Sequence, residues 1–332
     1  MNYSKKETSK KQKSLRSKKK KVGKKLSVIF LKAFLVCMIA VGVIAACAGI
    51  GVIKGVIDNA PEITSESVVP KGFKSTIFDS EGNKMQELIA SGTNRTMVTI
   101  DQIPAHVQNA FIAIEDERFY QHNGIDIQGI VRAGVTFVTS GFDKMQGAST
   151  ITQQLLKNNV FDFMSEETLM DSVERKIQEQ YLAIKLEETM SKEEILEAYL
   201  NTINLGQNTL GIQAASNRYF GKDVAELTIA ESAVLAGIAK NPEGYNPIKN
   251  PEDNKDRRAL VLNNMREQEM ITQVEYEAAM QEDVYAHIKN VNDIVTENAK
   301  VNSYFTDAVI ESVLEDSSFL IYFPQDTLLI LF

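Results

Sequence analysis

One uninterrupted apolar run near the N-terminus constrains this chain more than any other feature. Ala33–Ile53 is a stretch of 21 residues without a charge, long enough for a helix to cross the roughly 30 Å hydrocarbon core of a bilayer. It is longer than the apolar part of a cleavable signal peptide, and no A-x-A-like cleavage site is evident. The run therefore predicts a single-pass membrane anchor, with an uncleaved signal segment as the alternative.

The charges on the two sides of this run differ in sign. Residues 1–25 contain 12 basic residues and one acid, Glu7, whereas from Gly55 onward 22 basic residues stand against 43 acidic ones. Because Lys and Arg are enriched on the cytoplasmic side of membrane helices, we expect the tail in the cytoplasm and the body outside. An acidic body argues against a nucleic-acid-binding protein, although a nucleic-acid-binding tail is the alternative reading of the basic segment.

Cysteine and histidine placement limits the chemistry of the outer part. Both cysteines, Cys37 and Cys47, lie within the apolar run, so we expect neither a disulfide nor a thiolate metal site outside the membrane. The three histidines are too scattered to indicate a zinc site.

We divide the chain into a basic cytoplasmic tail (1–25), an anchor (26–54), a linker (55–72), a catalytic domain (73–285) and a linker remnant with an aberrant or truncated end (286–332).

The outer domain is predicted to be mainly α-helical. Residues 75–78 and 84–89 flank a turn signal at 79–83 and predict a small β-hairpin. We expect Asp101 to cap a helix that is entered through Pro104. Apolar spacing, Ser/Thr caps paired with Glu, and Gly or Pro stops predict the other helices, near 147–159, 171–189, 191–201, 212–220, 228–241, 257–269 and 272–281. The apolar residues 317–332 suggest either a buried strand or a damaged C-terminus, and we expect no sheet beyond the hairpin.

Three consecutive carboxylates, Glu115, Asp116 and Glu117, end the first of these helices. The negative end of the helix dipole and the repulsion between the acids both disfavour the charged forms and raise the pKa values. Apolar neighbours such as Phe111 and Phe119 add desolvation. A raised pKa is what a general base needs. The alternative is an acidic, solvated helix end.

Glu179 is the second acid that stands out by its context. It shares one helix face with Arg175, Leu182 and Leu186, while a second face of the same helix is also apolar. A helix that is apolar on two faces is largely buried. The alternative is an ordinary surface pair with Arg175, worth roughly a few tenths of a kcal/mol.

The segment between the two acids is rich in hydrogen-bonding side chains. Residues 147–158 (GASTITQQLLKN) begin with a cluster of hydroxyl and amide groups at a predicted helix start. Free N–H groups at a helix N-terminus bind anions. With Lys157, Arg175 and Lys176 nearby, this segment could hold a pyrophosphate. A polar surface helix with a Ser/Thr cap is the alternative.

The order of these segments resembles that of a known family. The five matching stretches are EDERFYQHNG at 115–124, GASTITQQLLKN at 147–158, RKIQEQYLAIKLE at 175–187, KEEILEAYLNTINLG at 192–206 and RRALVLNNM at 257–265. They are similar, in order and spacing, to the five signatures of the peptidoglycan glycosyltransferases, family 51 of the glycosyltransferases. The resemblance covers about residues 60–285 and implies a lysozyme-like, mainly α fold with a small hairpin and a membrane-proximal jaw.

The chain also resembles the N-terminal part of class A penicillin-binding proteins. Those proteins continue through a linker similar to residues 302–309 into a transpeptidase domain. No K-T-G occurs in this sequence, and S-x-x-K occurs only within the basic tail. We therefore expect no penicillin acylation, and we expect residues 317–332 to be the end of a truncated or frameshifted reading frame.

Carried over residue by residue, the resemblance implies catalytic roles. Glu115 is the expected general base, which deprotonates the 4-hydroxyl of the acceptor GlcNAc so that undecaprenyl pyrophosphate leaves the donor sugar with inversion. Glu179 is the expected second catalytic carboxylate, which orients nearby cations or helps hold Mg²⁺ or Mn²⁺ on the pyrophosphate; no organic cofactor is expected. The expected substrate-binding residues are Asp116, Phe119, His122, Ser149, Thr150, Gln154, Lys157, Asn158, Arg175, Lys176, Tyr199, Asn201 and Lys240. Three further matches, Glu194, Arg257 and Arg258, look structural.

The function implied by the resemblance is polymerisation of lipid II into β-1,4-linked glycan strands during bacterial cell-wall synthesis at the cell membrane. The expected partners are lipid II, the growing strand, membrane lipid and cell-division or elongation proteins. Residues 127–145 and 161–164 are apolar enough to enter lipid, or they are ordinary core. A lysozyme-like hydrolase that cuts glycan is an alternative enzyme, but it explains the cluster of Lys157, Arg175 and Lys176 and the membrane anchor less well. A catalytically defective scaffold that binds precursor or partner proteins, or a truncated product that folds poorly, is the remaining alternative.

Overall fold

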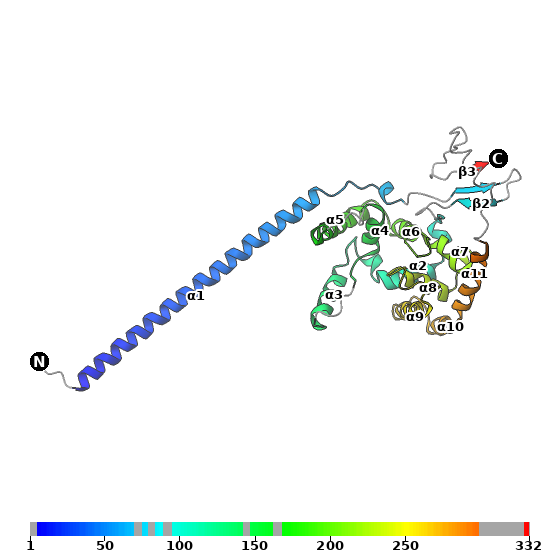
Figure 1. The fold of residues 1–332 in the computed structure, drawn as a ribbon. Coiled ribbons are helices and arrows are strands. Elements are labelled where there is room, and N and C mark those ends of the chain that lie inside the picture. The colour runs from blue at the N-terminus through cyan, green and yellow to red at the C-terminus, as the bar shows by residue number, and fades with distance from the viewer. Residues whose placement is uncertain are drawn as a thin grey trace. The chain divides into compact units, whose positions relative to one another are not determined.

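The computed structural model describes residues 5–69, 75–78, 84–88, 95–141, 147–161, 168–298 and 329–331. Two compact units make up the chain, Met1–Ala60 and Pro61–Phe332. Each unit has its own structure, and the ribbon in Figure 1 labels the elements of both.

The first unit is built around one helix, α1 (Lys5–Asp58). Its segment Ile29–Asp58 is long and apolar enough to cross a membrane, and it is not buried in the protein. The predicted anchor is therefore a helix of membrane-spanning length. The same helix also runs through the basic tail, which the composition did not predict.

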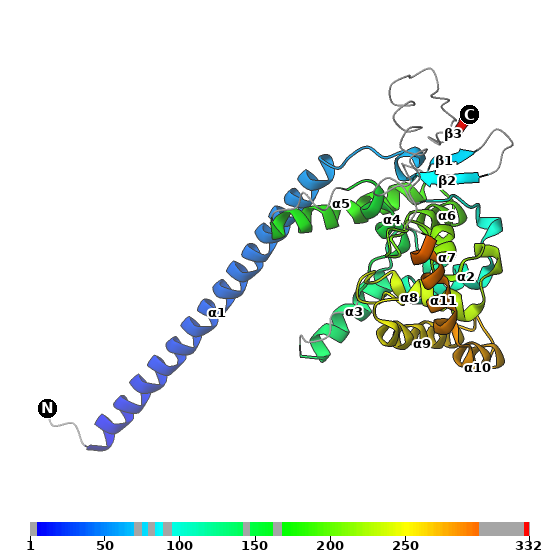
Figure 2. The ribbon, with the colours of Figure 1, turned by 45° about the vertical axis from the view of Figure 1, so that its right-hand side comes forward.

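The second unit is mainly α-helical, as predicted. Its helices are α2 (Ala105–Glu115), α3 (Ile127–Thr139), α4 (Ile151–Asn159), α5 (Leu169–Glu187), α6 (Lys192–Thr202), α7 (Ile212–Phe220), α8 (Ile229–Ile238), α9 (Pro251–Glu267), α10 (Gln273–Gln281) and α11 (Val284–Asn298), with short 3₁₀ turns at Ser65–Val68, Ile100–Gln102, Phe119–Gln121 and Val224–Glu226. Figure 2 shows this unit from a second side, with α11 along α7 and α10 beside α9.

The core of this unit surrounds α8, in which every residue from Ala230 to Ile238 is buried. Helix α8 packs against α2 and α9, while α4 packs against α5 and α6. Large side chains such as Phe111, Tyr199 and Tyr219 are fully buried between these layers. The packing fixes the end of α2 and the start of α4, which are the two places where the expected site residues are concentrated.

Side-chain caps start the helices largely where the sequence predicted. Ser191 accepts a hydrogen bond from the Glu194 N–H at 3.2 Å, and the Glu194 carboxylate accepts one from the Ser191 N–H at 2.7 Å. Thr228 and Glu231 repeat this capping box at α8. The prediction for Asp101 was wrong. That residue lies in a 3₁₀ turn, and α2 begins after Pro104 without a side-chain cap.

Helices α3 and α11 were not predicted. The carboxylate of Asp126 starts α3 by accepting a hydrogen bond from the Gly129 N–H at 2.9 Å. The apolar side chains that project from α3 are 57–70 % exposed, so ordinary core is wrong for this helix; these residues are Ile127, Val131, Val135 and Val138. Two apolar segments, 127–145 and 161–164, were considered for entry into lipid. Of these, residues 142–145 and 162–164 lie outside the described residues.

The predicted hairpin is confirmed. Strand β1 (Ser75–Phe78) pairs antiparallel with β2 (Lys84–Leu88), with Ser75 opposite Leu88. A third strand, β3 (Leu329–Leu331), pairs parallel with β1 and completes the order β2-β1-β3. The strand that was one reading of residues 317–332 is therefore confirmed for Leu329–Leu331, and it extends the sheet of the hairpin instead of forming another one. Of that segment, residues 317–328 lie outside the described part of the chain.

Candidate active site

Glu115 is the last residue of α2 and places its carboxylate beside α4. Oε2 accepts a hydrogen bond from Gln154 Nε2 at 2.9 Å. Oε1 is buried and has no hydrogen-bond partner among the residues that the structure describes. A buried carboxylate oxygen without a partner is costly, so its retention indicates an acceptor kept free for a ligand.

Burial is the main reason why the pKa of Glu115 is raised above its ordinary value. The hydrogen bond from Gln154 and the positive charges of Arg257 and Lys240 oppose this rise, and the negative charge of Asp116 adds to it by the smallest amount. The direction of the pKa shift that was predicted from the sequence is thus correct, but repulsion between the acids was expected to contribute more than burial. Desolvation dominates because the end of α2 is enclosed by α4 and its neighbours.

Asp116 ties the end of α2 to the start of α4. Its carboxylate lies 3.0 Å from His122 Nε2 and accepts a hydrogen bond from the Ile151 N–H at 2.9 Å. Asp116, Phe119 and His122 are all largely buried. The expectation that these three residues bind substrate stays a prediction, but the contacts favour a supporting role behind Glu115.

A close approach between two segments fixes the start of α4. Thr150 caps the helix by accepting a hydrogen bond from the Gln153 N–H, and its hydroxyl donates to the Gly124 carbonyl at 2.8 Å. Gly124 has φ +83°, and a Cβ there would lie 2.5 Å from the Ala183 carbonyl carbon. Only glycine fits this position without displacing α5.

Tyr199 extends the hydrogen bonds around Glu115 into the core. Its hydroxyl donates to Gln154 Oε1 at 3.4 Å, while Gln154 Nε2 donates to Glu115. Burial raises the pKa of Tyr199 far above its ordinary value, so the phenol stays a donor at neutral pH. This relay orients the Gln154 amide with its N–H group toward the Glu115 carboxylate.

Glu179 gathers two cations at the other end of the site. It is 1 % exposed, and it pairs with Arg175 and, at 2.8 Å, with Lys176. Lys176 Nζ also donates to Ser149 Oγ at 2.8 Å. The alternative of an ordinary surface pair is wrong for a carboxylate this buried. Helix α4 connects the two clusters, since Ser149 precedes it and Gln154 lies within it.

The remaining expected site residues take different positions. Lys157 is part-buried in the last turn of α4, and Asn158 beside it is exposed. Asn201 is fully buried, and its amide bonds the backbone of Val98 and Glu197 at 2.8–3.0 Å. With both ends of its amide engaged, Asn201 is placed to support the chain before α2 rather than to contact a substrate.

Arg257 was expected to be structural, and its environment argues otherwise. Its charge acts on Glu115, and its Nε is buried without a hydrogen-bond partner within the described residues. Arg258, one residue on, does have the expected structural role, because it donates to the carbonyls of Met280 and Glu282. Adjacent residues on a helix point about 100° apart. The sequence therefore could not show which of the two neighbouring arginines acts on Glu115.

The side chains around the site do not form a metal centre of their own. No group of three or more His, Cys, Asp or Glu residues in the described part of the chain is arranged to hold a metal ion. Glu179, the expected ligand, already binds two cationic side chains. It therefore fits a divalent cation poorly. The expected Mg²⁺ or Mn²⁺ stays a prediction, which polymerisation in the presence of EDTA would test.

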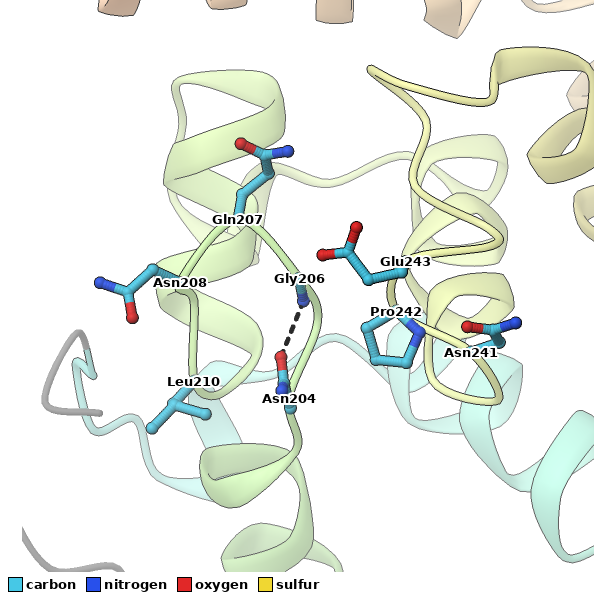
Figure 3. A pocket seen from close by; sticks show the side chains of 8 residues that line it. All are labelled: Asn204, Gly206, Gln207, Asn208, Leu210, Asn241, Pro242 and Glu243. Carbon is cyan, nitrogen blue, oxygen red and sulfur yellow. Dashed lines mark hydrogen bonds between the residues drawn. The ribbon is translucent and has the colours of Figure 1, made fainter. Parts of the chain in front are cut away.

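A separate hollow of about 460 Å³ lies between two loops (Figure 3). Its lining residues are Asn204, Gly206, Gln207, Asn208, Leu210, Asn241, Pro242 and Glu243. The Gly206 N–H donates to Asn204 Oδ1 at 2.9 Å across the first loop. The lining is rich in amides and contains one carboxylate and no basic side chain, so it does not suit a pyrophosphate. None of the expected site residues lines it.

Comparisons with known proteins agree with the motifs. A profile of the Transglycosylase family matches residues 81–266, more than half of the chain. The chain is 37 % identical over 298 residues to "Penicillin-binding protein 1A" of Clostridium botulinum (strain Langeland), covering 87 % of this chain and 34 % of that protein. It is 38 % identical over 313 residues to the protein of the same name from Clostridium tetani, covering 91 % and 38 %.

A solved structure is also similar to the chain. It is the crystal structure of penicillin-binding protein 1A from Haemophilus influenzae, with 24 % identity and a TM-score of 0.37 over 65 % of this chain and 21 % of that one. The chain spans about a third of the length of the curated relatives it matches.

Proposed function

This chain belongs to the transglycosylase family, and from that membership and the geometry around Glu115 we propose that it polymerises lipid II into the β-1,4-linked glycan strands of peptidoglycan. The observation that carries this proposal is the buried, unpartnered Oε1 of Glu115. A carboxylate with a raised pKa and one free oxygen is suited to take a proton from a bound hydroxyl.

The proposed reaction is one displacement with inversion. Glu115 Oε1 takes the proton of the acceptor 4-hydroxyl as that oxygen forms a bond to C1 of the donor sugar. The bond from C1 to the pyrophosphate oxygen breaks, and its electron pair leaves with undecaprenyl pyrophosphate. Gln154 holds Oε2 during this step, so that the other oxygen remains directed at the acceptor.

The leaving group needs charge neutralisation more than it needs a proton. Arg175 and Lys176 lie on one side of Glu179 and are held there by its carboxylate. In the proposed complex they bind the donor pyrophosphate together with Ser149 and Lys157. Glu179 then acts by orienting the two cations, which is why it is buried and fully engaged.

The membrane helix and α3 suit a substrate with a lipid tail. We propose that α1 anchors the chain in the cell membrane with its basic end in the cytoplasm, which places the second unit outside. The exposed apolar side chains of α3 are proposed to enter the outer leaflet. Both features keep the reaction centre close to the surface from which lipid II is presented.

The test of this proposal is polymer formation by the full-length protein in detergent with labelled lipid II. Products are resolved by size for the wild type, Glu115→Gln and the matched control Glu188→Gln, which alters an exposed carboxylate that pairs with Lys185. We expect a ladder of glycan polymers from the wild type and the control, and none from Glu115→Gln. A folded wild type that makes no polymer would favour a scaffold that only binds the precursor or a partner protein.

A further inference from the structure

Behind the start of α4 lies a buried ion pair that has no part in the proposed reaction. The side chain of Glu187 is 5 % exposed and lies 2.8 Å from Lys192 Nζ. Its Oε1 also accepts a hydrogen bond from the Thr152 hydroxyl at 2.5 Å. The pair therefore joins three helices, because Thr152 belongs to α4, Glu187 to α5 and Lys192 to α6.

Both charges stand at the unfavourable ends of their helices. Glu187 is the last residue of α5, at the negative end of its dipole, and Lys192 is the first residue of α6, at the positive end. Each placement is disfavoured by roughly 0.3–1 kcal/mol at an exposed site, and burial adds a desolvation penalty. Helix stability thus gives no reason for this arrangement, which indicates that the pair serves the positions of the groups around it.

The Lys192 ammonium extends the junction to the first motif. It lies 4.4 Å from the ring centroid of Phe119, whose side chain is fully buried. A cation over an aromatic face is attracted by the ring, and more strongly when desolvated. Phe119 is three residues after Asp116, in the segment that follows Glu115. The Lys192 ammonium therefore contacts both this segment and the Glu187 carboxylate that is bonded to α4.

Thr152 connects this junction to the reaction centre. It lies two residues before Gln154 on α4, and the intervening turn is rigid helix. At the start of the helix, Ile151 is bonded through its backbone to Asp116, and Thr150 and Gln153 are bonded to the Gly124 carbonyl. The bond from Thr152 to Glu187 adds an attachment to the end of α5.

We propose that the Glu187–Lys192 pair is a positioning device for the reaction: it fixes the rotation of α4 and so keeps Gln154 Nε2 on Glu115 Oε2. This inference rests on the proposed function for its kinetic consequence. Glu187 and Lys192 do not touch the substrate. They act through Thr152 and Gln154.

Loss of the pair has a consequence that a merely stabilising contact would not have. The groups that shift the pKa of Glu115 are Gln154 on α4, Arg257 on α9, Lys240 after α8 and the adjacent Asp116, while Tyr199 on α6 donates to Gln154. Among these groups, Gln154 is the one that α4 carries. Its hydrogen bond lowers the pKa of Glu115, so losing it moves the acid limb of the kcat profile to higher pH. Arg175 and Lys176 lie on α5 and stay paired with Glu179, so the shift of the acid limb, rather than KM for lipid II, is the signature of the lost contact.

The decisive variant exchanges the two charges, Glu187→Lys with Lys192→Glu. The exchange keeps an ion pair and places each charge at the favourable end of its helix, which offsets part of the loss of the other contacts, so the protein should still fold. The new lysine cannot accept the Thr152 hydrogen bond, and a carboxylate is repelled by the face of Phe119. We expect kcat to fall by about tenfold to a hundredfold, with an upward shift of the acid limb.

The matched control exchanges the exposed pair in the last turn of the same helix, Lys185→Glu with Glu188→Lys. That pair spans 2.9 Å between side chains that are about half exposed, and its exchange should change neither kcat nor the acid limb. A second variant, Thr152→Val, removes the hydroxyl that donates to Glu187 while keeping the size of the side chain. It is expected to shift the acid limb in the same direction, and it tests the proposal even where the charge exchange does not fold.

Titration of the Glu115 carboxyl by ¹³C NMR separates this inference from the proposed function. Protein labelled at the glutamate carboxyl carbons is used, and the Glu115 signal is assigned by its loss in Glu115→Gln. A higher titration midpoint in the exchanged or Thr152→Val variant supports the positioning role even when the wild type makes no polymer. Unchanged titration, or wild-type kcat and acid limb in a folded variant, would overturn it.

Discussion

Replacing Gly124 by alanine tests the closest contact in the site. A Cβ at this position would lie 2.5 Å from the Ala183 carbonyl carbon, 2.6 Å from its oxygen and 2.7 Å from the Ile184 nitrogen. These are backbone atoms of α5, so no side chain can move aside to relieve the contact. The residue also has φ +83°, a conformation that L-residues rarely adopt.

The size of the effect follows from two separate costs. A left-handed conformation costs an alanine about 1–2 kcal/mol, and forcing an extra methyl group into a packed site costs about 1–3 kcal/mol. We therefore expect Gly124→Ala to lower the free energy of unfolding by about 2–5 kcal/mol. Polymerisation should fall as well, because the Gly124 carbonyl accepts hydrogen bonds from Thr150 and Gln153 at the start of α4.

The matched control is Gly134→Ala in α3, where a Cβ would meet no atom within 4 Å. Alanine in a helix interior is favoured over glycine by roughly 0.5–1 kcal/mol, so this variant should be more stable than the wild type. The assay is urea unfolding of the full-length protein in detergent, followed by far-ultraviolet circular dichroism. A Gly124→Ala variant within about 0.5 kcal/mol of the wild type, or less damaging than Gly134→Ala, would refute the packing argument.

Four further changes should have distinct effects. Because burial raises the pKa of Glu115, the folded protein binds this proton more tightly than the unfolded chain does. Stability is therefore lost as the pH rises from the unfolded pKa to the folded pKa, and the loss is complete above the folded pKa. Glu115→Gln should therefore raise Tm at neutral pH while abolishing polymerisation. Arg257→Gln removes a charge that lowers the pKa of Glu115, so the acid limb of the rate profile should move to higher pH. Glu179→Gln weakens two charged hydrogen bonds at a buried site and should lower the free energy of unfolding by about 1–3 kcal/mol, measured by urea unfolding. Val131→Asp on the exposed face of α3 should slow polymerisation in lipid vesicles and leave the rate in detergent unchanged.

Local chemistry explains which elements were predictable from the sequence. The hairpin was recognisable because a turn signal separates two short apolar stretches, and α6 and α8 were recognisable because Ser191 and Thr228 each pair with a glutamate three residues on. Helix α3 was missed although Ile127, Val131, Val135 and Val138 recur at helical spacing, because the segment was interpreted from its overall apolar character and not from its period. Strand β3 pairs with a partner far away in the sequence, and no local signal predicts such a pairing.

The candidate site was predictable in its residue types but not in its contacts. Motif resemblance identified Glu115, Gln154 and Glu179, which the structure places around α4. It could not show that Asn201 is fully engaged with backbone or that the charge of Arg257 lowers the pKa of Glu115, since both depend on how side chains are placed within a packed core. The junction of Glu187, Lys192 and Thr152 likewise requires three helices to meet.

We propose that Glu115 is a base activated by burial. The most direct test is the pH dependence of lipid II polymerisation by the full-length wild type, measured beside Glu115→Gln. We predict that the rate falls on the acid side with a midpoint above the ordinary glutamate pKa of about 4.3, and that Glu115→Gln makes no polymer at any pH. A rate that stays constant down to that ordinary value, or polymer from Glu115→Gln, would contradict the account.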